Sequence, residues 1–343
     1  MYTVKRTRTV SCQTASSVDK QFTEKSVQCD NHILNSYNRD RKSSHLTYDE
    51  LVENYLGNNE CIIKWLQELE IIARSVVCPQ CQNLMVLISC NDRSDGYKWQ
   101  CRKAVNGKRH KVESSIRKGS WFDNSNMTLT EILKFTYWWC IGLDQSQIIS
   151  QLKLSPNTGV DWTMFCREVC LATIEKKTEK IGGDGKTVQI DESKVGKRKY
   201  HRGHYVEGQW VFGGIEQDSR KCFIESVEDR SEKTLIPLVQ KWILPGTIII
   251  SDCWKGYINL EKYGYVHKTV NHSKEFVNKD GDNTNKIEGH WRQLKANLPT
   301  HGRRKYHYST YFAEFMWRYV HKQEDLFWVF LNDAKQLYNP SNI

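Results

Sequence analysis

Apolar runs rich in β-branched residues alternate with amphipathic stretches in the second half of the chain, which predicts the strands and helices of an α/β domain. The predicted strands cover residues 188–191, 209–215, 222–227, 247–252 and 266–270. Helices are predicted over 231–242 and from Thr284 to about Leu298, with a short helix from Trp254. This order predicts three antiparallel strands followed by parallel additions. It is the order of the ribonuclease H-like fold, a mixed five-stranded sheet flanked by helices, in which the first and fourth strands lie side by side.

The first half of the chain has apolar residues at helical spacing over 47–75 and 127–180. Within the second of these regions, residues 145–152, a Ser-Pro turn and residues 160–174 resemble a helix-turn-helix. One interpretation places the second helix in a DNA groove. An ordinary helical hairpin explains the pattern equally well, so both interpretations stay open.

The net charge of the chain indicates what kind of partner it binds. The formal net charge is +10 and the pI is about 8.9, which favours a polyanion, with nucleic acid ahead of an anionic membrane. Plain solubility is the alternative explanation. No apolar run reaches the length of a membrane span, and the first residues lack the apolar middle of a signal peptide. We therefore expect the 12 cysteines to be mostly reduced, so clustered cysteines are candidates for metal binding.

One cysteine cluster has the spacing of a zinc site. Cys78 and Cys81 form a CxxC knuckle, and Cys101 follows a strand-like run. The fourth ligand is either His110 or Cys90, and we prefer His110 because the distal knuckle of a zinc ribbon normally supplies a pair of ligands. Unrelated structural cysteines are the alternative. The sequence therefore predicts a structural Zn²⁺ in a zinc ribbon.

Basic residues surround this ribbon and follow the first predicted strand of the α/β domain. A ribbon with such a charge is typical of a DNA-binding module. The candidate DNA-binding residues are Arg102, Lys103, Arg117, Lys118, Lys197, Arg198, Lys199, His201 and Arg202.

Three carboxylates are placed where open α/β sheets carry their chemistry. Asp191 and Asp252 end the first and fourth predicted strands, and Glu288 lies on the last helix. Three carboxylates suffice to hold two divalent ions if one of them bridges, and such a pair promotes phosphodiester cleavage. Lys295 lies seven residues after Glu288 on the same helix face, where its ammonium would meet a DNA phosphate. Each residue alone is commonly a turn or surface residue, whereas the joint pattern is more specific.

The chain resembles Merlin-type DNA transposases and the related bacterial insertion-sequence transposases over about residues 78–320. The motifs that carry the resemblance are CPQC, SIRKGSWF, VQIDESKVGKRKYHRG, QWVFGGIE, SDCWKGY, TVNHSKEFV, NTNKIEGHWRQLK and YFAEFMWR. The resemblance implies that Asp191, Asp252 and Glu288 are the catalytic triad of a cut-and-paste transposase. It implies Mg²⁺ or Mn²⁺ as cofactor, and terminal inverted repeats and target DNA as substrates.

These patterns predict six segments: a disordered basic and polar tail, N-terminal helices, the zinc ribbon, a helical region, the catalytic domain and a C-terminal tail. Their expected bounds are 1–46, 47–76, 77–118, 119–183, 184–325 and 326–343. We expect a homo-oligomer, at least a dimer on DNA, no membrane partner, and a nuclear location in a eukaryote or a cytoplasmic or nucleoid one otherwise. Three rivals are a domesticated DNA-binding protein without transposition, a ribonuclease H-like nuclease acting on other substrates, and a zinc-dependent structural adaptor.

Overall fold

The computed structural model describes residues 45–105, 107–177, 179–196, 208–270, 283–299, 305–338 and 340. Residues 42–343 form one compact unit. Most of the tail predicted over 1–46 lies outside the described residues. Its last residue, Leu46, is buried, and its backbone is held by the Asp325 carboxylate (2.6 Å) and the Tyr137 hydroxyl (2.8 Å). Within the described parts of the chain, every helix is too short or too polar to cross a membrane.

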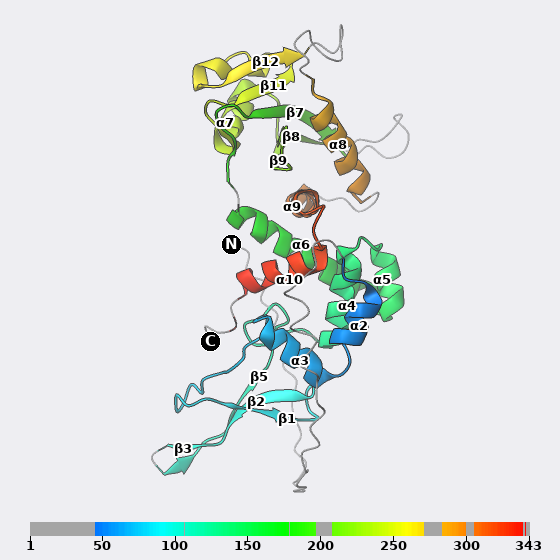
Figure 1. Ribbon diagram of the computed structural model, residues 1–343, viewed down its shortest axis with the longest axis vertical. Helices are drawn as coiled ribbons and strands as arrows, with labels where there is room; N and C mark the ends of the chain where they lie inside the picture. The colour runs from blue at the N-terminus through cyan, green and yellow to red at the C-terminus, as the bar shows by residue number, and fades with distance from the viewer. Residues whose placement is uncertain are drawn as a thin grey trace. The chain divides into compact units, whose positions relative to one another are not determined.

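The second half of the chain contains a mixed five-stranded sheet (Figure 1). Its strands are β7 (Thr187–Val195), β8 (Gln209–Glu216), β9 (Cys222–Val227), β11 (Ile248–Asp252) and β12 (Val266–Val270). They lie in the order β12-β11-β7-β8-β9, with β7, β8 and β9 antiparallel and β11 parallel to both β7 and β12. The first and fourth strands of the sheet are therefore neighbours, as the order of elements predicts.

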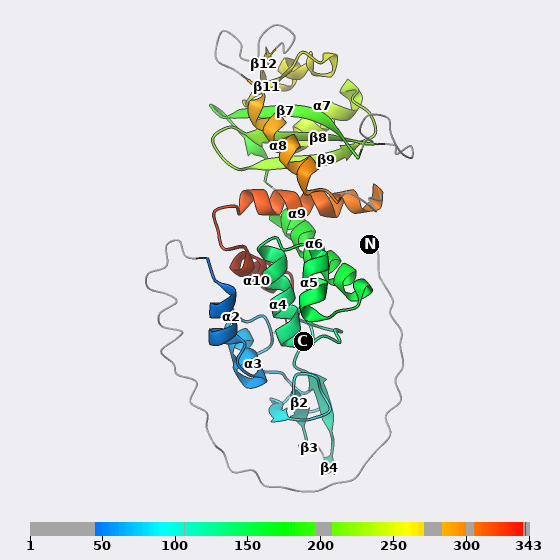
Figure 2. The ribbon, with the colours of Figure 1, turned by 90° about the vertical axis from the view of Figure 1, so that its right-hand side faces the viewer.

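Helices cover both faces of this sheet (Figures 1 and 2). The α7 helix (Glu232–Trp242) packs on one face, together with the 3₁₀ turns η2 (Lys255–Tyr257) and η3 (Leu260–Tyr263). On the opposite face lie α8 (Asn285–Asn297) and α9 (Tyr308–Val320). Alternation along the strands separates the two cores, so Ile190 packs on the α7 side and Val211 on the α8 side. A separate two-stranded parallel ladder pairs β6 (Ile181–Gly182) with β10 (Ile243–Leu244).

The first half of the chain is helical apart from the ribbon. Its helices are α2 (Tyr48–Tyr55), α3 (Asn59–Glu68), α4 (Leu129–Cys140), α5 (Gln145–Leu152) and α6 (Pro156–Lys177). Thr47 and Thr128 cap α2 and α4, each in a reciprocal capping box with the glutamate three residues later. The amphipathic faces of these helices meet in one apolar core with many tryptophans.

The segment predicted as a C-terminal tail over 326–343 contains the helix α10 (Leu326–Leu337). Phe327, Phe330 and Leu331 recur at helical spacing and are buried in the core of the first half of the chain. Asp325 caps the helix by accepting the backbone N–H groups of Phe327 and Trp328. An apolar stripe with an N-cap is the signal that separates α10 from a tail.

The ribbon is a three-stranded antiparallel sheet of β1 (Val86–Ser89), β2 (Tyr97–Cys101) and β5 (Val112–Ser115). The hairpin of β3 (Ala104–Val105) and β4 (Lys108–Arg109) projects from it. Trp99 and Ile116 of the ribbon share the apolar core of the surrounding helices. The predicted boundaries at 76 and 118 therefore do not separate independently packed cores.

Candidate metal centres and nucleic-acid interface

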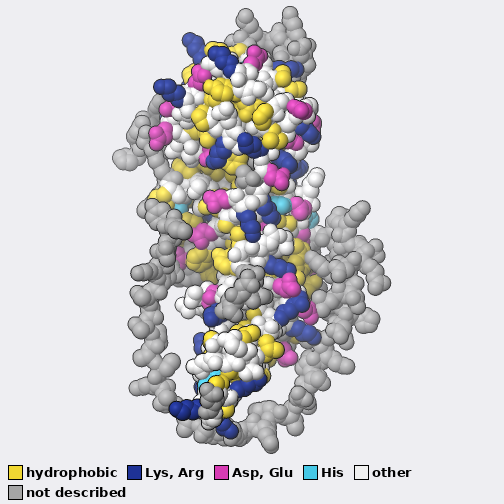
Figure 3. Space-filling view, turned by 90° about the vertical axis from the view of Figure 1, so that its left-hand side faces the viewer, with side chains coloured by type: hydrophobic (Ala, Val, Ile, Leu, Met, Phe, Trp, Pro, Cys, Tyr) yellow, Lys and Arg dark blue, Asp and Glu magenta, His cyan; other side chains and the backbone are white. Residues whose placement is uncertain are grey.

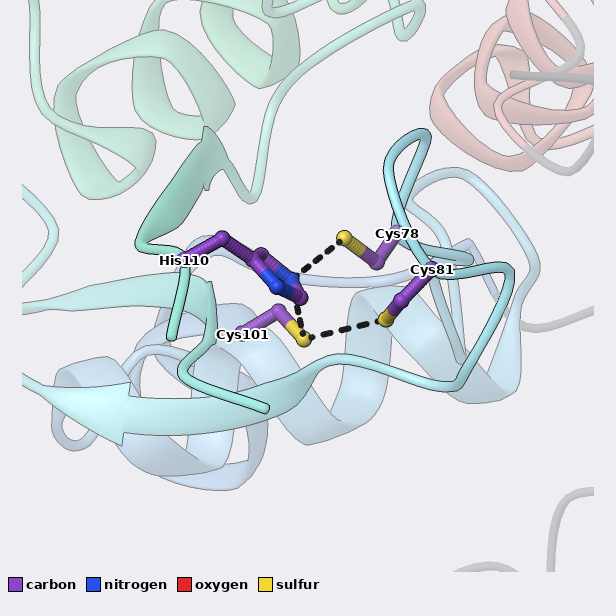
Figure 4. Close-up of side chains that lie close together, drawn as sticks. All are labelled: Cys78, Cys81, Cys101 and His110. Carbon is purple, nitrogen blue, oxygen red and sulfur yellow. Dashed lines mark hydrogen bonds between the residues drawn. The ribbon is translucent and has the colours of Figure 1, made fainter. Parts of the chain in front are cut away.

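Three thiols and one imidazole meet beside the ribbon (Figure 4). Cys78 and Cys81 come from the turn before β1, Cys101 ends β2, and His110 follows β4. Their donor atoms all lie within 4.8 Å of one another. The closest pairs are His110 Nε2 to Cys101 Sγ (3.3 Å), His110 Nε2 to Cys78 Sγ (3.4 Å) and Cys81 Sγ to Cys101 Sγ (3.6 Å). A zinc tetrahedron has edges of about 3.3–3.8 Å, so this donor set fits such an ion.

Local backbone geometry shapes the knuckle that carries the first two thiols. The backbone N–H of Gln82 donates to the carbonyl of Cys78 (2.9 Å), and Gln82 itself adopts a left-handed conformation with φ 57°. Asn83 closes the turn and lowers the pKa of the Cys81 thiol to about 6. A lowered thiol pKa favours the thiolate, which is the form that binds metal. Cys90 lies outside the group, and burial raises the pKa of its thiol.

Asp191 and Asp252 lie on neighbouring strands. Asp252 ends β11 as predicted, whereas β7 does not end at Asp191 but continues to Val195, because its pairing with β8 extends to Gln209. Ile248, Ile249 and Ile250 of β11 pair with residues 187–189 of β7, and the same register continued by two residues places Asp252 beside Asp191. Paired residues of parallel strands point to the same face of a sheet. Both carboxylates therefore lie on the face that α8 covers.

The α8 helix is fastened to β7 next to Asp191. The Gln189 side-chain oxygen accepts the backbone N–H groups of Lys286 and Ile287 (3.1 Å each) at the start of the helix. One turn after Glu288, Trp291 donates its indole N–H to Asp191 Oδ2 (3.1 Å). These contacts fix the helix that carries Glu288 against the strand that carries Asp191.

A glycine makes room for that indole. Gly213 of β8 pairs with Asp191, and a Cβ at this position would lie 2.6 Å from a Trp291 ring carbon and 2.8 Å from the Phe223 carbonyl oxygen. Any larger residue would therefore have to displace either the ring or the neighbouring strand. The contact between Trp291 and Asp191 thus depends on Gly213, which is distant in sequence from Trp291.

The negative charges of Asp252 and Glu288 both act on the carboxyl of Asp191. Burial, with the negative charges of Asp252 and Glu288, raises the pKa of Asp191 to about 6. Glu288 is exposed and accepts a hydrogen bond from the Thr284 hydroxyl (3.0 Å). Among the described residues, the Cys₃His cluster is the one group of three or more potential ligands that gathers within 4.8 Å, so the carboxylates form a looser set.

Glu192 is a titratable residue to which the sequence assigned no role. It is buried on the α7 side of β7, and burial raises the pKa of its carboxyl to about 7. Its Oε1 atom has no hydrogen-bond partner among the described residues. Its place in the strand, one residue after Asp191, was the only sequence signal.

Two comparisons with known proteins concern the α/β half of the chain. Residues 178–319 match the model of the ISXO2-like transposase domain. This region is similar to insertion-sequence transposases. A transposase-like protein of Haemophilus influenzae is 28% identical over 103 residues, which cover 29% of this chain and 80% of that protein. The matched region spans the five-stranded sheet, α8 and nearly all of α9, so it includes all three carboxylates.

The predicted DNA contacts divide into exposed residues near the ribbon, residues outside the described ranges, and the buried Arg117. Arg102, Lys103 and Lys118 are exposed, and Lys and Arg side chains gather over the β3–β4 hairpin (Figure 3). The remaining predicted contacts, Lys197, Arg198, Lys199, His201 and Arg202, lie outside the described residues. Lys295, which is predicted to meet a DNA phosphate, is exposed on α8, two turns after Glu288.

Arg117 is a correction to the predicted DNA contacts. Its guanidinium is buried, pairs with both oxygens of the Asp95 carboxylate, and donates to the carbonyls of Ser125 (3.2 Å) and Met127 (2.7 Å). A cation in this position is already neutralised and cannot reach a phosphate. The run of basic residues in the sequence concealed its structural role, because charge patterning does not report burial.

The predicted helix pair before the five-stranded sheet is present as α5 and α6. The αL residue Lys153 ends α5, and Pro156 opens α6. The α6 helix continues to Lys177 and packs against α9 and α10. This packing suits a helical hairpin and leaves the helix-turn-helix interpretation undecided. The α6 thiols of Cys166 and Cys170 are buried in the apolar core, which fits inert thiols rather than a metal pair.

Proposed function

We propose that this protein is a DNA transposase of the Merlin type, built on a ribonuclease H-like domain. It cuts DNA at the terminal inverted repeats of its element and joins those ends to target DNA. The observation that carries the proposal is the register of β11 on β7, which when continued places Asp252 beside Asp191, with Glu288 on a helix fastened to β7. The match of residues 178–319 to a transposase domain supports it.

Asp191, Asp252 and Glu288 would hold two Mg²⁺ or Mn²⁺ ions. The donor set fits, because carboxylate oxygens are the ligands that these hard cations prefer. The three carboxylates also repel one another, as the raised pKa of Asp191 reflects, and a bound cation would relieve this repulsion. Such ions activate the attacking oxygen and neutralise the leaving one when they are bound. Trp291 orients the Asp191 carboxylate through its indole N–H, and Lys295 is placed to bind a DNA phosphate.

The ribbon would bind a structural Zn²⁺ through Cys78, Cys81, Cys101 and His110. The exposed cations of the β3–β4 hairpin would then be presented to DNA phosphates on a rigid support. We propose that the protein acts as a homo-oligomer, at least a dimer on DNA. Its place of action would be the nucleus in a eukaryote and the cytoplasm or nucleoid otherwise.

Cleavage of DNA that carries the element's ends tests this function. The purified protein should cut such DNA in Mg²⁺ or Mn²⁺ and should be inactive in EDTA. Asp191→Asn should abolish cutting while leaving DNA binding intact. Asp218→Asn is the matched control, because Asp218 lies exposed in the turn between β8 and β9. Equal cleavage by the Asp191 variant and the wild type would refute the mechanism.

A further inference from the structure

Arg230 lies between two indole rings at the end of the sheet that carries Asp252. Its guanidinium carbon is 4.3 Å from the ring centroid of Trp210 and 4.3 Å from that of Trp254. A second cation joins this stack, because Lys194 Nζ lies 5.4 Å from the Trp210 centroid. Cations at these distances are attracted to the faces of aromatic rings. The stack of Lys194, Trp210, Arg230 and Trp254 is called the indole clamp below.

Hydrogen bonds tie the indole clamp to Asp252. The Trp254 indole N–H donates to the carbonyl of Arg230 (2.9 Å), and the Trp254 backbone N–H donates to Asp252 Oδ1 (3.0 Å). Gly256 leaves space for the indole, since a Cβ there would lie 3.0 Å from Trp254 Nε1 and 3.2 Å from the Arg230 carbonyl oxygen. The position of Arg230 is therefore set by the same loop that holds a predicted catalytic carboxylate.

Within the described parts of the chain, neither Arg230 nor Lys194 forms an ion pair, and no described acceptor takes the Arg230 guanidinium N–H groups. The nearest acidic residue in the sequence, Asp229, is used by the backbone of Ser231 and the hydroxyl of Thr234. The Arg230 charge reaches as far as Glu192, which follows Asp191 on β7. An oriented guanidinium with free donors beside this site is suited to an anion.

We propose that Arg230, held by Trp210 and Trp254, binds a backbone phosphate of DNA that flanks the one cleaved at the carboxylates. The inference rests on the proposed function, and it adds a phosphate site on the α7 side of the sheet, away from Lys295 on α8. Stacking removes the rotational freedom that a surface arginine would lose on binding. The planar fork of the guanidinium then meets two phosphate oxygens at once.

A purely structural role for Arg230 makes a different prediction. If Arg230 only supports Trp254 behind Asp252, its replacement would lower thermal stability or disturb the carboxylates, but the number of phosphates contacted by DNA-bound protein would not change. That number is measured by the slope of log affinity against log salt concentration, because each neutralised phosphate releases counterions.

The test uses the full chain and a short fluorescein-labelled DNA duplex in EDTA, with fluorescence anisotropy measured over a series of KCl concentrations. Arg230→Gln should reduce the salt slope by about one and weaken binding about five- to tenfold at fixed salt. Arg230→Lys should keep most of the slope but still weaken binding about threefold, because an ammonium lacks the fork. The matched control is Lys233→Gln, which removes one charge from an exposed side chain three residues away. It should change binding less than about twofold.

Each outcome decides the proposal. A salt slope of Arg230→Gln equal to that of the wild type, or equal losses in Arg230→Gln and Lys233→Gln, would overturn the phosphate site while leaving the proposed function standing. If Arg230→Gln proves unstable by thermal denaturation, Arg230→Lys decides, and unchanged affinity in that variant overturns the site. Failure of the wild-type protein to bind DNA would remove both proposals together.

Discussion

The Cys₃His cluster and the carboxylate set are both candidate metal centres, yet they are assembled in opposite ways. The cluster draws its four donors from residues 78–110, and they lie within 4.8 Å of one another. The carboxylates come from β7, β11 and α8, spread over almost 100 residues, and they gather less tightly. Two of the cluster's ligands are set by one short turn, whereas Glu288 depends on Gln189 and Trp291 to meet Asp191.

This difference is the one expected between a structural metal site and a catalytic metal site. A closed set of four soft ligands is typical of structural zinc and leaves no position for a substrate. A looser set of hard ligands leaves room for a DNA phosphate among them. Removing a ligand from the first centre should therefore affect folding, and removing one from the second should affect chemistry.

The largest expected effect is the loss of the cluster. Cys81→Ser should lose bound zinc and unfold the ribbon, because zinc binding in such small modules contributes on the order of 10 kcal/mol. Elemental analysis and circular dichroism measure the two losses. Cys90→Ser is the matched control and should retain its zinc, since Cys90 lies outside the cluster. Equal zinc content in the wild type and Cys81→Ser would show that the cluster is not the binding site.

A smaller effect should appear in the pH dependence of stability without divalent ions. The pKa values of Asp191 (about 6) and Glu192 (about 7) are raised by burial, so folding favours their protonated forms. Their contribution is complete below the ordinary pKa values of the unfolded chain and is lost as pH rises through 6 to 7. In EDTA the free energy of unfolding should therefore fall from about pH 4 to about pH 7, by at most about 3 kcal/mol for Asp191.

Urea denaturation at several pH values measures this fall. Asp191→Asn should make the dependence shallower, and added Mg²⁺ should stabilise the wild type more at the upper end of the range than at the lower. If the free energy of unfolding depended on pH equally in the wild type and in Asp191→Asn, protonation of Asp191 would not be linked to folding.

The third effect concerns Lys295. Lys295→Ala should fold and bind Mn²⁺ normally but lose cleavage by about ten- to a hundredfold, the value of one charge-assisted contact of about 1.5–3 kcal/mol. Arg292→Ala removes a cation from another exposed position of α8 and is the matched control. Normal cleavage by Lys295→Ala would make this lysine a solvated helix residue.

The smallest effect should come from Trp291→Phe, which keeps the aromatic ring but removes the N–H donor to Asp191. The loss of one hydrogen bond of about 1 kcal/mol should slow cleavage about fivefold, with little change in stability. Trp242→Phe also removes an indole donor, here to Glu225, on the α7 side of the sheet, and should leave cleavage unchanged. Equal rates for the two variants would mean that the indole does not orient Asp191.

The secondary structure of the sheet could be predicted closely, because apolar β-branched runs and helical periodicity are local signals. The pairing of β7 with β11 followed from the order of elements. The contact between Trp291 and Asp191 could not be predicted, because it depends on the missing side chain of Gly213 in a third element. Likewise, nothing in a row of basic residues distinguishes the buried Arg117 from its exposed neighbour Lys118.

For the Cys₃His cluster, the sequence predicted some ligands more firmly than others. The CxxC spacing identified Cys78 and Cys81, and the preference for His110 over Cys90 rested on how ribbons distribute their ligands between two knuckles. The structure brings His110 into the group, although the role of these residues as zinc ligands stays a prediction. The apolar spacing of Phe327, Phe330 and Leu331 is a local signal for α10, whereas its packing against helices from the first half of the chain is not.

The position of α10 also bears on the synthesis of this protein. The helix completes an apolar core whose other members begin at Leu46, and Asp333 joins it to Lys177 (2.6 Å) and to the indole of Trp317 (2.7 Å). The early helices leave the ribosome long before α10 does, so the apolar surface that α10 covers stays exposed until the last part of translation. Contacts so distant in sequence also slow folding. We therefore expect nascent chains of this protein to depend on chaperones, and truncation before Leu326 to yield aggregates rather than a smaller folded protein.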